Sequence, residues 1–107
     1  MQFSELKAQV KGIGLGELRA DEDNYLEVVV TKDKLEGICR ILESFLGPPV
    51  WPPEIKLSSQ IEDAIRGFGG ISVGQTLYYC NEGSDTVFCM LWPWGDRNHI
   101  TLKIVKK

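Results

Sequence analysis

Residues Val87 to Trp92 read Val-Phe-Cys-Met-Leu-Trp and contain no polar side chain. Their β-branched and aromatic content predicts a strand. A strand with one face in water should alternate apolar and polar residues, and this one does not. We therefore expect a central strand that is covered on both faces. The second cover is either another part of the chain or another molecule.

The sequence around this run predicts a three-stranded antiparallel meander. Residues 71–80 are rich in β-branched and aromatic side chains at period two, and residues 99–105 alternate in the same way. The middle strand, residues 86–92, is separated from them by turn-forming segments at 81–85 and 93–98. Three consecutive strands joined by short turns are expected to pair with their neighbours in the chain.

The register of the first hairpin decides which side chains share a face, because a one-residue slip exchanges the two faces. A tip at Gly83-Ser84 would put these residues on a core face: Leu77, Tyr79, Phe88, Met90, Trp92, Ile100, Leu102 and Ile104. The other face would then hold Tyr78, Cys80, Val87, Cys89, Leu91 and Val105. The alternative register stays open. The first five residues of the second group are the candidate interface with a partner.

Upstream, residues 25–31 predict a further strand, and apolar stripes at helical spacing predict helices at 33–46 and 59–68. Each helix begins with a capping-box pattern, in which Asp33 and Ser59 would cap the first turns. These elements would pack the sheet.

The N-terminal part is less regular. Residues 3–11 match a short helix, with a strand as the alternative, and residues 15–19 match a strand that turns back through residues 21–24. This segment would pair with a sheet edge or cap the outer face. The expected fold is one α+β domain spanning residues 1–107. It is a two-layer sandwich of about four mainly antiparallel strands packed by two or three helices.

Composition and charge narrow the function classes. The net charge of −3 argues against nucleic acid as a partner, because nucleic-acid-binding proteins carry a basic footprint. No apolar run approaches the ~20 residues that a membrane helix needs. The three cysteines form no close pair of the kind that structural zinc sites use, so we expect no metal and no cofactor. Their odd number suggests free thiols in the cytoplasm.

The segment from Trp92 to His99 is the candidate ligand-binding site. It holds Trp92, Trp94, Asp96, Arg97 and the chain's single histidine, His99. Tryptophan rings can stack on a planar ligand, and a guanidinium suits carboxylate or phosphate groups. The alternative is a hairpin turn with Trp92 in the core, Trp94 covering an edge and Asp96 closing the turn.

Two functions of different classes follow from these features. The first is a small self-associating interaction or ligand-binding module, most simply a homodimer that takes a small-molecule or protein partner. The second is a small enzyme acting on an anionic small molecule. His99 would be its acid or base, Asp96 would orient the imidazole, and Arg97 would hold the anionic group.

Overall fold

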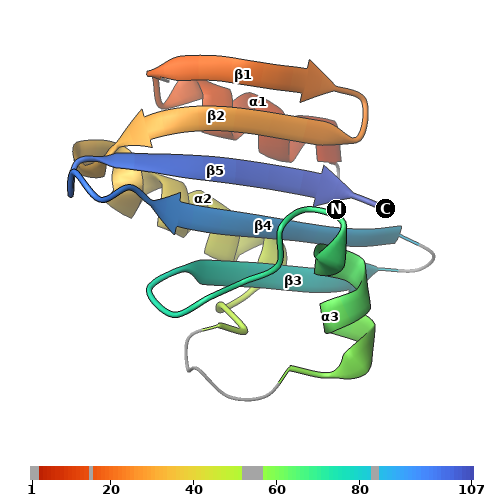
Figure 1. Ribbon diagram of the computed structural model, residues 1–107. Helices are drawn as coiled ribbons and strands as arrows, with labels where there is room; N and C mark the ends of the chain where they lie inside the picture. Colours follow the sequence, from red (N-terminus) through yellow and green to blue (C-terminus); the bar gives the residue numbers. More distant parts are fainter. Residues whose placement is uncertain (1–2, 15, 52–56, 83–84) are drawn as a thin grey trace.

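The computed structural model describes residues 3–14, 16–51, 57–82 and 85–107 (Figure 1). Its helices are α1 (Phe3–Gly12), α2 (Leu35–Leu46) and α3 (Ser59–Arg66), with a 3-10 turn at Lys32–Lys34. Its strands are β1 (Glu17–Glu22), β2 (Tyr25–Thr31), β3 (Thr76–Glu82), β4 (Asp85–Pro93) and β5 (His99–Lys106). They form one antiparallel sheet in the order β1-β2-β5-β4-β3. The expected α+β class is confirmed, and the sheet has five strands rather than about four.

The predicted meander is present, and β5 closes it by inserting between β4 and β2. Tyr25 pairs with Val105 on one side of β5, and Val87 pairs with Lys106 on the other. Consequently β4 and β5 both lie inside the sheet, with β1 and β3 as its edges. An interior position is what the unbroken apolar sequence of β4 indicated.

The register of the first hairpin agrees with a tip at Gly83-Ser84, because Glu82 pairs with Asp85. Residues 83 and 84 themselves lie outside the described residues. The assignment of the β5 side chains to a face is wrong, however. Leu91 pairs with Leu102, so the apolar row of β5 lies on the same face as Tyr78 and Leu91. The β4–β5 connection sets this register, and its length was not interpretable from the sequence.

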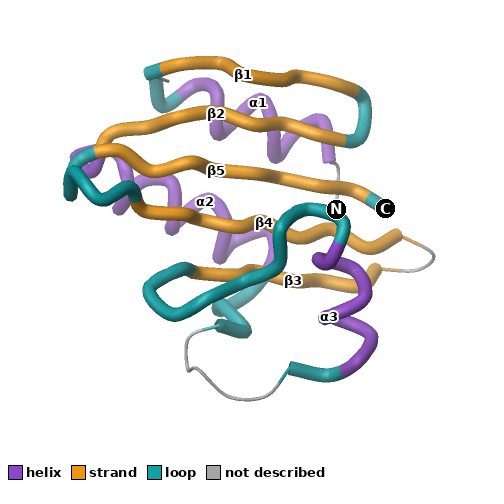
Figure 2. Tube along the Cα trace, viewed as in Figure 1, coloured by secondary structure: helices purple, strands orange, loops and turns teal. Residues whose placement is uncertain are grey.

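Helices α1 and α2 cover the rear face of the sheet across β2, β5, β4 and β3 (Figures 1 and 2). The apolar stripe of α2, including Ile38 and Leu42, packs there beside Leu6 and Val10 of α1. All four of these side chains are fully buried. The helix predicted for residues 3–11 is therefore confirmed, and its apolar spacing gives the reason.

The front face of β3 and β4 is covered by α3 and by the segment that follows it (Figure 2). Ala64 and Ile65 of α3 pack against Leu77, Phe88 and Met90. The strand β4 is therefore covered on both faces by other parts of the same chain, which answers the question raised by its sequence. Over β1 and β2 the sheet carries helices on the rear face alone (Figure 1).

This arrangement corrects the prediction of an exposed interface. Tyr78, Val87, Cys89 and Leu91 keep 2%, 3%, 0% and 3% of their surface exposed, and Cys80 is half-buried against the same cluster. They lie on the rear face, under the apolar stripe of α2. Four of these side chains belong to the core of the chain, and Cys80 packs against that core.

The expected strand at residues 71–80 begins only at Thr76. Residues 72–75 form a turn instead, in which the Ser72 backbone N–H donates to the Gln75 side chain at 2.7 Å and the Gln75 N–H donates to the Ser72 carbonyl at 3.1 Å. Gly74 has φ of 87°, a left-handed conformation that suits glycine. The period-two pattern in this stretch was therefore misleading, because local hydrogen bonds satisfy the backbone there.

The two predicted helix starts also shift. Helix α2 begins at Leu35 without a side-chain cap, and the Asp33 carboxylate contacts the Thr31 hydroxyl instead. Helix α3 is capped by Ser58 rather than Ser59, since the Ile61 N–H donates to the Ser58 hydroxyl at 3.3 Å. It ends at Arg66 rather than at residue 68.

The hairpin predicted near the N-terminus is present as β1 and β2, with Glu22 pairing with Tyr25 across the turn. An ion pair joins it to α1, because the Lys7 ammonium lies 2.8 Å from the Asp21 carboxylate. Lys11 contacts the same carboxylate, and both lysines lower the pKa of Asp21. The N-terminal segment thus both extends the sheet and covers its rear face.

Candidate functional site

The connection between β4 and β5 is a turn that Asp96 closes. The Asp96 carboxylate accepts the backbone N–H groups of Asn98 at 2.9 Å and His99 at 3.0 Å. The Trp94 N–H donates to the His99 carbonyl at 2.8 Å. Hydrogen bonds from the backbone of His99 and Asn98, together with the His99 side chain, lower the pKa of Asp96 to about 2. Asp96 is thus a structural acceptor that is ionised near neutral pH.

The imidazole of His99 is oriented by the same carboxylate. Its Nδ1 lies 2.5 Å from Asp96 Oδ2, and its ring centroid lies 5.0 Å from that of Trp94. Among the described residues, none forms a hydrogen bond with the other ring nitrogen, Nε2. The side chain is 39% exposed, so the imidazole is accessible to a ligand or to water. An imidazole fixed through one nitrogen can present the other in a defined direction.

Trp94 lies against the front face of the sheet and is held by three groups. Its Nε1–H donates to the Thr101 hydroxyl at 2.8 Å. His99 packs on its ring, and the Arg19 guanidinium lies 5.6 Å from the ring centroid. Arg19 sits at the β-bulge of β1, where the pairing with β2 shifts between Leu18 and Ala20. Bulges often redirect a side chain in this way. Trp94 therefore has a fixed position, and its side chain forms a wall shared by two neighbouring pockets.

A pocket of about 280 Å³ opens beside this wall. Its lining combines apolar surface with two cationic side chains: Lys32, Leu35, Pro93, Trp94, Arg97, Asn98, His99 and Ile100. None of the described residues in this lining carries a carboxylate. The volume is near the lower end of the range of about 300–1,000 Å³ typical of small-molecule sites. An apolar cavity edged by lysine and arginine matches a small anion that carries an apolar body.

A second cavity lies against the same Trp94–His99 wall. It has a volume of about 350 Å³ and is lined by Gly16, Glu17, Val29, Thr31, Trp94 and His99. Among its described lining residues the one carboxylate, that of Glu17, lies 3.4 Å from the Arg19 guanidinium. Gly16 is required at this wall, because a β-carbon there would lie 2.9 Å from the Val29 carbonyl oxygen.

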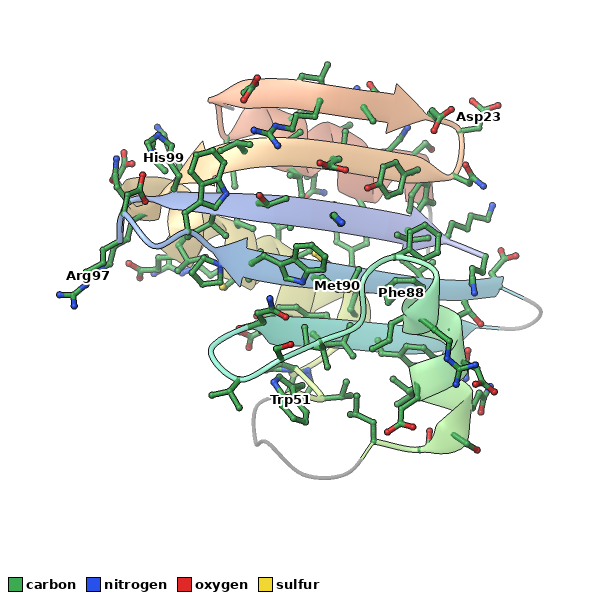
Figure 3. All side chains as sticks on the ribbon, viewed as in Figure 1. Asp23, Trp51, Phe88, Met90, Arg97 and His99 are labelled. Carbon is green, nitrogen blue, oxygen red and sulfur yellow. The ribbon has the colours of Figure 1, made fainter. Side chains whose placement is uncertain are left out.

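Arg97 and His99 point in different directions in Figure 3. Arg97 extends from the tip of the turn away from the sheet, whereas His99 lies beside β2 and β5 (Figure 3). Both line the pocket of about 280 Å³, so Arg97 forms part of its rim. Asp96 and His99 are brought together as expected, and Arg97 joins them only at the edge of the pocket.

Trp92 lies outside this pocket. It is half-buried in the front-face cluster with Phe68 and Phe88. The Lys103 ammonium lies 3.8 Å from its ring centroid, and a β-carbon on Gly69 would come within 2.4 Å of the ring. Among the described residues its Nε1 finds no hydrogen-bond partner. Of the five candidate ligand-binding residues, Trp94, Arg97 and His99 line the pocket, Asp96 supports it, and Trp92 belongs to the core.

Several lining residues were not predicted from the sequence. Lys32 reaches the site because its N–H donates to the Asn98 carbonyl at 2.7 Å, next to the pairing of Thr31 with His99. This contact depends on β5 lying beside β2, a long-range pairing without a local signal. Pro93 and Asn98, by contrast, lie within the segment from Trp92 to His99 that the sequence had indicated as a candidate site.

The three cysteines are free thiols: Cys39 and Cys80 are half-buried, and Cys89 is buried. Burial raises the pKa of Cys89, and Cys39 adds to that shift. Burial and a hydrogen bond with Cys39 likewise raise the pKa of Tyr78. Within the described part of the chain, no group of three histidine, cysteine or acidic side chains has the arrangement of a metal site.

Comparisons with protein-family models, with curated proteins and with solved structures find no significant match. Among the helices formed by the described residues, none combines the length and the apolar character needed to cross a bilayer.

Proposed function

We propose that this protein is a small binding module whose ligand is a small anion with an apolar body, such as an aromatic carboxylate. The observation that carries the proposal is the pocket of about 280 Å³ beside Trp94 and His99. Leu35, Pro93 and Ile100 contribute apolar surface to it, and its two charged residues are both cationic. On a chain with a net charge of −3, such a lining is a local reversal of sign.

The backbone at Arg97 supports the same proposal. Arg97 has φ of 62°, in the left-handed region, and is the one described non-glycine residue with positive φ. For an L-residue this conformation costs roughly 1–2 kcal/mol, and glycine adopts it freely. Local strain of this kind is concentrated at binding and catalytic sites. An arginine in a position that favours glycine is explained if its guanidinium has a task at the pocket rim.

The test is an NMR titration with benzoate, which provides one carboxylate on an apolar ring. Benzyl alcohol is the neutral analogue, and benzylammonium reverses the charge. We expect benzoate to bind best. We expect Arg97→Gln and Lys32→Gln each to weaken its binding about threefold to fivefold, since an exposed ion pair contributes up to about 1 kcal/mol.

The matched control is Arg66→Gln, which removes an exposed arginine that pairs with Asp63 on α3, away from the pocket. It should leave the benzoate affinity unchanged. Equal affinity of the wild type for benzoate and benzyl alcohol would contradict the proposed preference for an anion. So would an equal loss in Arg66→Gln and Arg97→Gln, because a general charge effect would then explain the binding.

A second candidate function is an enzyme that uses His99 as general base. The specific observation in its favour is the 2.5 Å contact between His99 Nδ1 and Asp96, the arrangement that orients many catalytic histidines. Hydrolysis of p-nitrophenyl acetate, compared with the same concentration of free imidazole, separates the two functions. A binding module should not exceed imidazole, whereas an enzyme should exceed it and lose that advantage in His99→Gln.

Self-association through Tyr78, Cys80, Val87, Cys89 and Leu91 is not part of this proposal, because α2 covers that face. We propose a cytoplasmic location, because a reducing compartment would preserve the three free thiols.

A further inference from the structure

We propose that a second site, on the front face at the opposite end of the β2–β5 ladder, binds an organic ammonium group. It is a cavity of about 400 Å³ lined by Glu22, Asn24, Tyr25, Phe68 and Val105. Tyr25 and Val105 pair at one end of the β2–β5 ladder, and Thr31 and His99 pair at the other. The two sites are therefore separated by the length of these strands, and this inference does not depend on the anion pocket.

Aromatic rings form the apolar wall of this cavity. Tyr25 and Phe68 stack with ring centroids 5.9 Å apart and planes inclined at 24°, and Phe68 meets Phe88 edge to face at 5.6 Å. Figure 3 shows Phe88 beneath the segment that follows α3. The negative face of an aromatic ring attracts an ammonium group, and this attraction strengthens where water is excluded.

Carboxylates supply the charge. Glu22 lines the cavity, and the Tyr25 hydroxyl donates to the Glu27 carboxylate at 2.5 Å. Burial raises the pKa of Tyr25, and the charges of Glu27 and Glu22 raise it further. No lysine or arginine is found among the described residues of the lining, and the Asn24 side chain adds an amide. Two stacked rings, one lining carboxylate and a second carboxylate nearby favour a cation.

Two lysines of the chain already contact aromatic residues in or near this cavity. The Lys107 ammonium lies 5.7 Å from the Phe68 ring centroid, although Lys107 does not line the cavity. The Lys103 ammonium donates to the Phe68 carbonyl at 3.4 Å and covers Trp92. Lys107 thus lies over the ring of Phe68, which the proposed ligand would also contact, and it would compete with that ligand.

The ligand class is an alkylammonium group, which a free amine or the lysine side chain of another protein would each supply. The probes are n-butylammonium chloride and the blocked tripeptide acetyl-Gly-Lys-Gly-amide, each titrated into the ¹⁵N-labelled protein, with sodium chloride at equal ionic strength as reference. We expect shifts at Glu22, Asn24, Tyr25 and Phe68 beyond those caused by sodium chloride.

Two pairs of variants test the contacts. Glu22→Gln should weaken binding about threefold to fivefold, the effect of losing one exposed ion pair, while the neighbouring Asp23→Asn should not. Asp23 is exposed and lies at the outer tip of the β1–β2 turn (Figure 3). Lys107→Gln should strengthen binding, because it removes the competing ammonium. Lys106→Gln, which makes the same change in charge beside Asp85, should not.

The two probes distinguish a free amine from a protein lysine as the ligand. Similar binding of both probes supports a site for the ammonium group alone, and tighter binding of the tripeptide assigns the ligand to a protein lysine. Shifts no larger than those from sodium chloride, or equal effects of Glu22→Gln and Asp23→Asn, would overturn the proposal. Weaker binding in Lys107→Gln would show that Lys107 does not compete.

Discussion

Single residues explain why the β4–β5 turn has the shape it has. Asp96 holds the turn by accepting two backbone N–H groups and contacting the His99 imidazole. Arg97 follows in a left-handed conformation, between Asp96 and the two residues whose N–H groups Asp96 accepts. The sequence indicated that Asp96 would close the turn, because aspartate commonly does so. It gave no indication of the left-handed conformation at Arg97, because arginine is not a residue type that this conformation favours.

The titration of Asp96 provides a test at this scale. Its pKa is lowered from the ordinary value of 3.8 to about 2 by bonds that require the carboxylate. Because the folded pKa lies below the unfolded one, the stability that these bonds contribute is fully present above about pH 4. That stability, and the bonds themselves, are lost as the pH falls through the folded pKa. The amide resonances of Asn98 and His99 should therefore titrate with a midpoint near pH 2, and a midpoint close to 4 would show that the carboxylate is not bonded as described.

Arg97→Gly separates strain from binding. Glycine removes the backbone strain of the folded state, which raises the free energy of unfolding, but it also makes the unfolded chain more flexible, which lowers that free energy. We expect the first effect to equal or exceed the second, so that the free energy of unfolding stays equal or rises by up to about 1 kcal/mol. Benzoate binding should weaken in the same variant. Urea denaturation measures the first effect and NMR titration the second. A loss of stability beyond about 1 kcal/mol would mean that the Arg97 side chain makes structural contacts.

At the scale of elements, the continuous apolar sequence of β4 gave the correct architecture and an incorrect interface. It required two covers, and α2 and α3 supply them. Periodicity identified the helices and most strands, because each buries one regular stripe. It could not show that β5 returns beside β2, and the faces of the sheet and the position of Lys32 both depend on that pairing. The cap of α3 shifted by one position, from Ser59 to Ser58, because neighbouring serines can replace one another, whereas α2 has no side-chain cap.

Leu91→Glu measures what the covered face contributes. The side chain is 3% exposed under α2, so the change removes apolar packing and buries a carboxylate without a partner. We expect a loss of about 4 kcal/mol or more, which would largely unfold a domain of this size. Leu18→Glu is the matched control, because Leu18 is 54% exposed on β1. It should change stability by no more than about 0.5 kcal/mol. A folded, soluble Leu91→Glu monomer would restore the interface hypothesis.

At the scale of the whole molecule, the helices cover the two faces of the sheet unequally. The rear face is covered by α1 and α2, and the front face only where α3 crosses β3 and β4 (Figure 1). The two proposed sites lie at opposite ends of the β2–β5 ladder, one edged by Lys32 and Arg97 and the other, on the front face, edged by Glu22. The segment from Trp92 to His99 was predicted as a ligand-binding site from local sequence. The part that Lys32 and Leu35 play in it, and the whole of the cavity at Glu22 and Phe68, were not predicted, because they depend on contacts between segments far apart in the chain.

The most direct test is a residue-by-residue NMR map of the ¹⁵N-labelled protein with benzoate. We predict that the amides that shift will cluster at Lys32, Leu35 and residues 94–100, while Glu22, Tyr25 and Phe68 stay unchanged. Such a map would place an anionic ligand against Trp94 and His99. A cluster elsewhere on the sheet, or no shifts at residues 94–100, would contradict the proposed pocket and the function built on it.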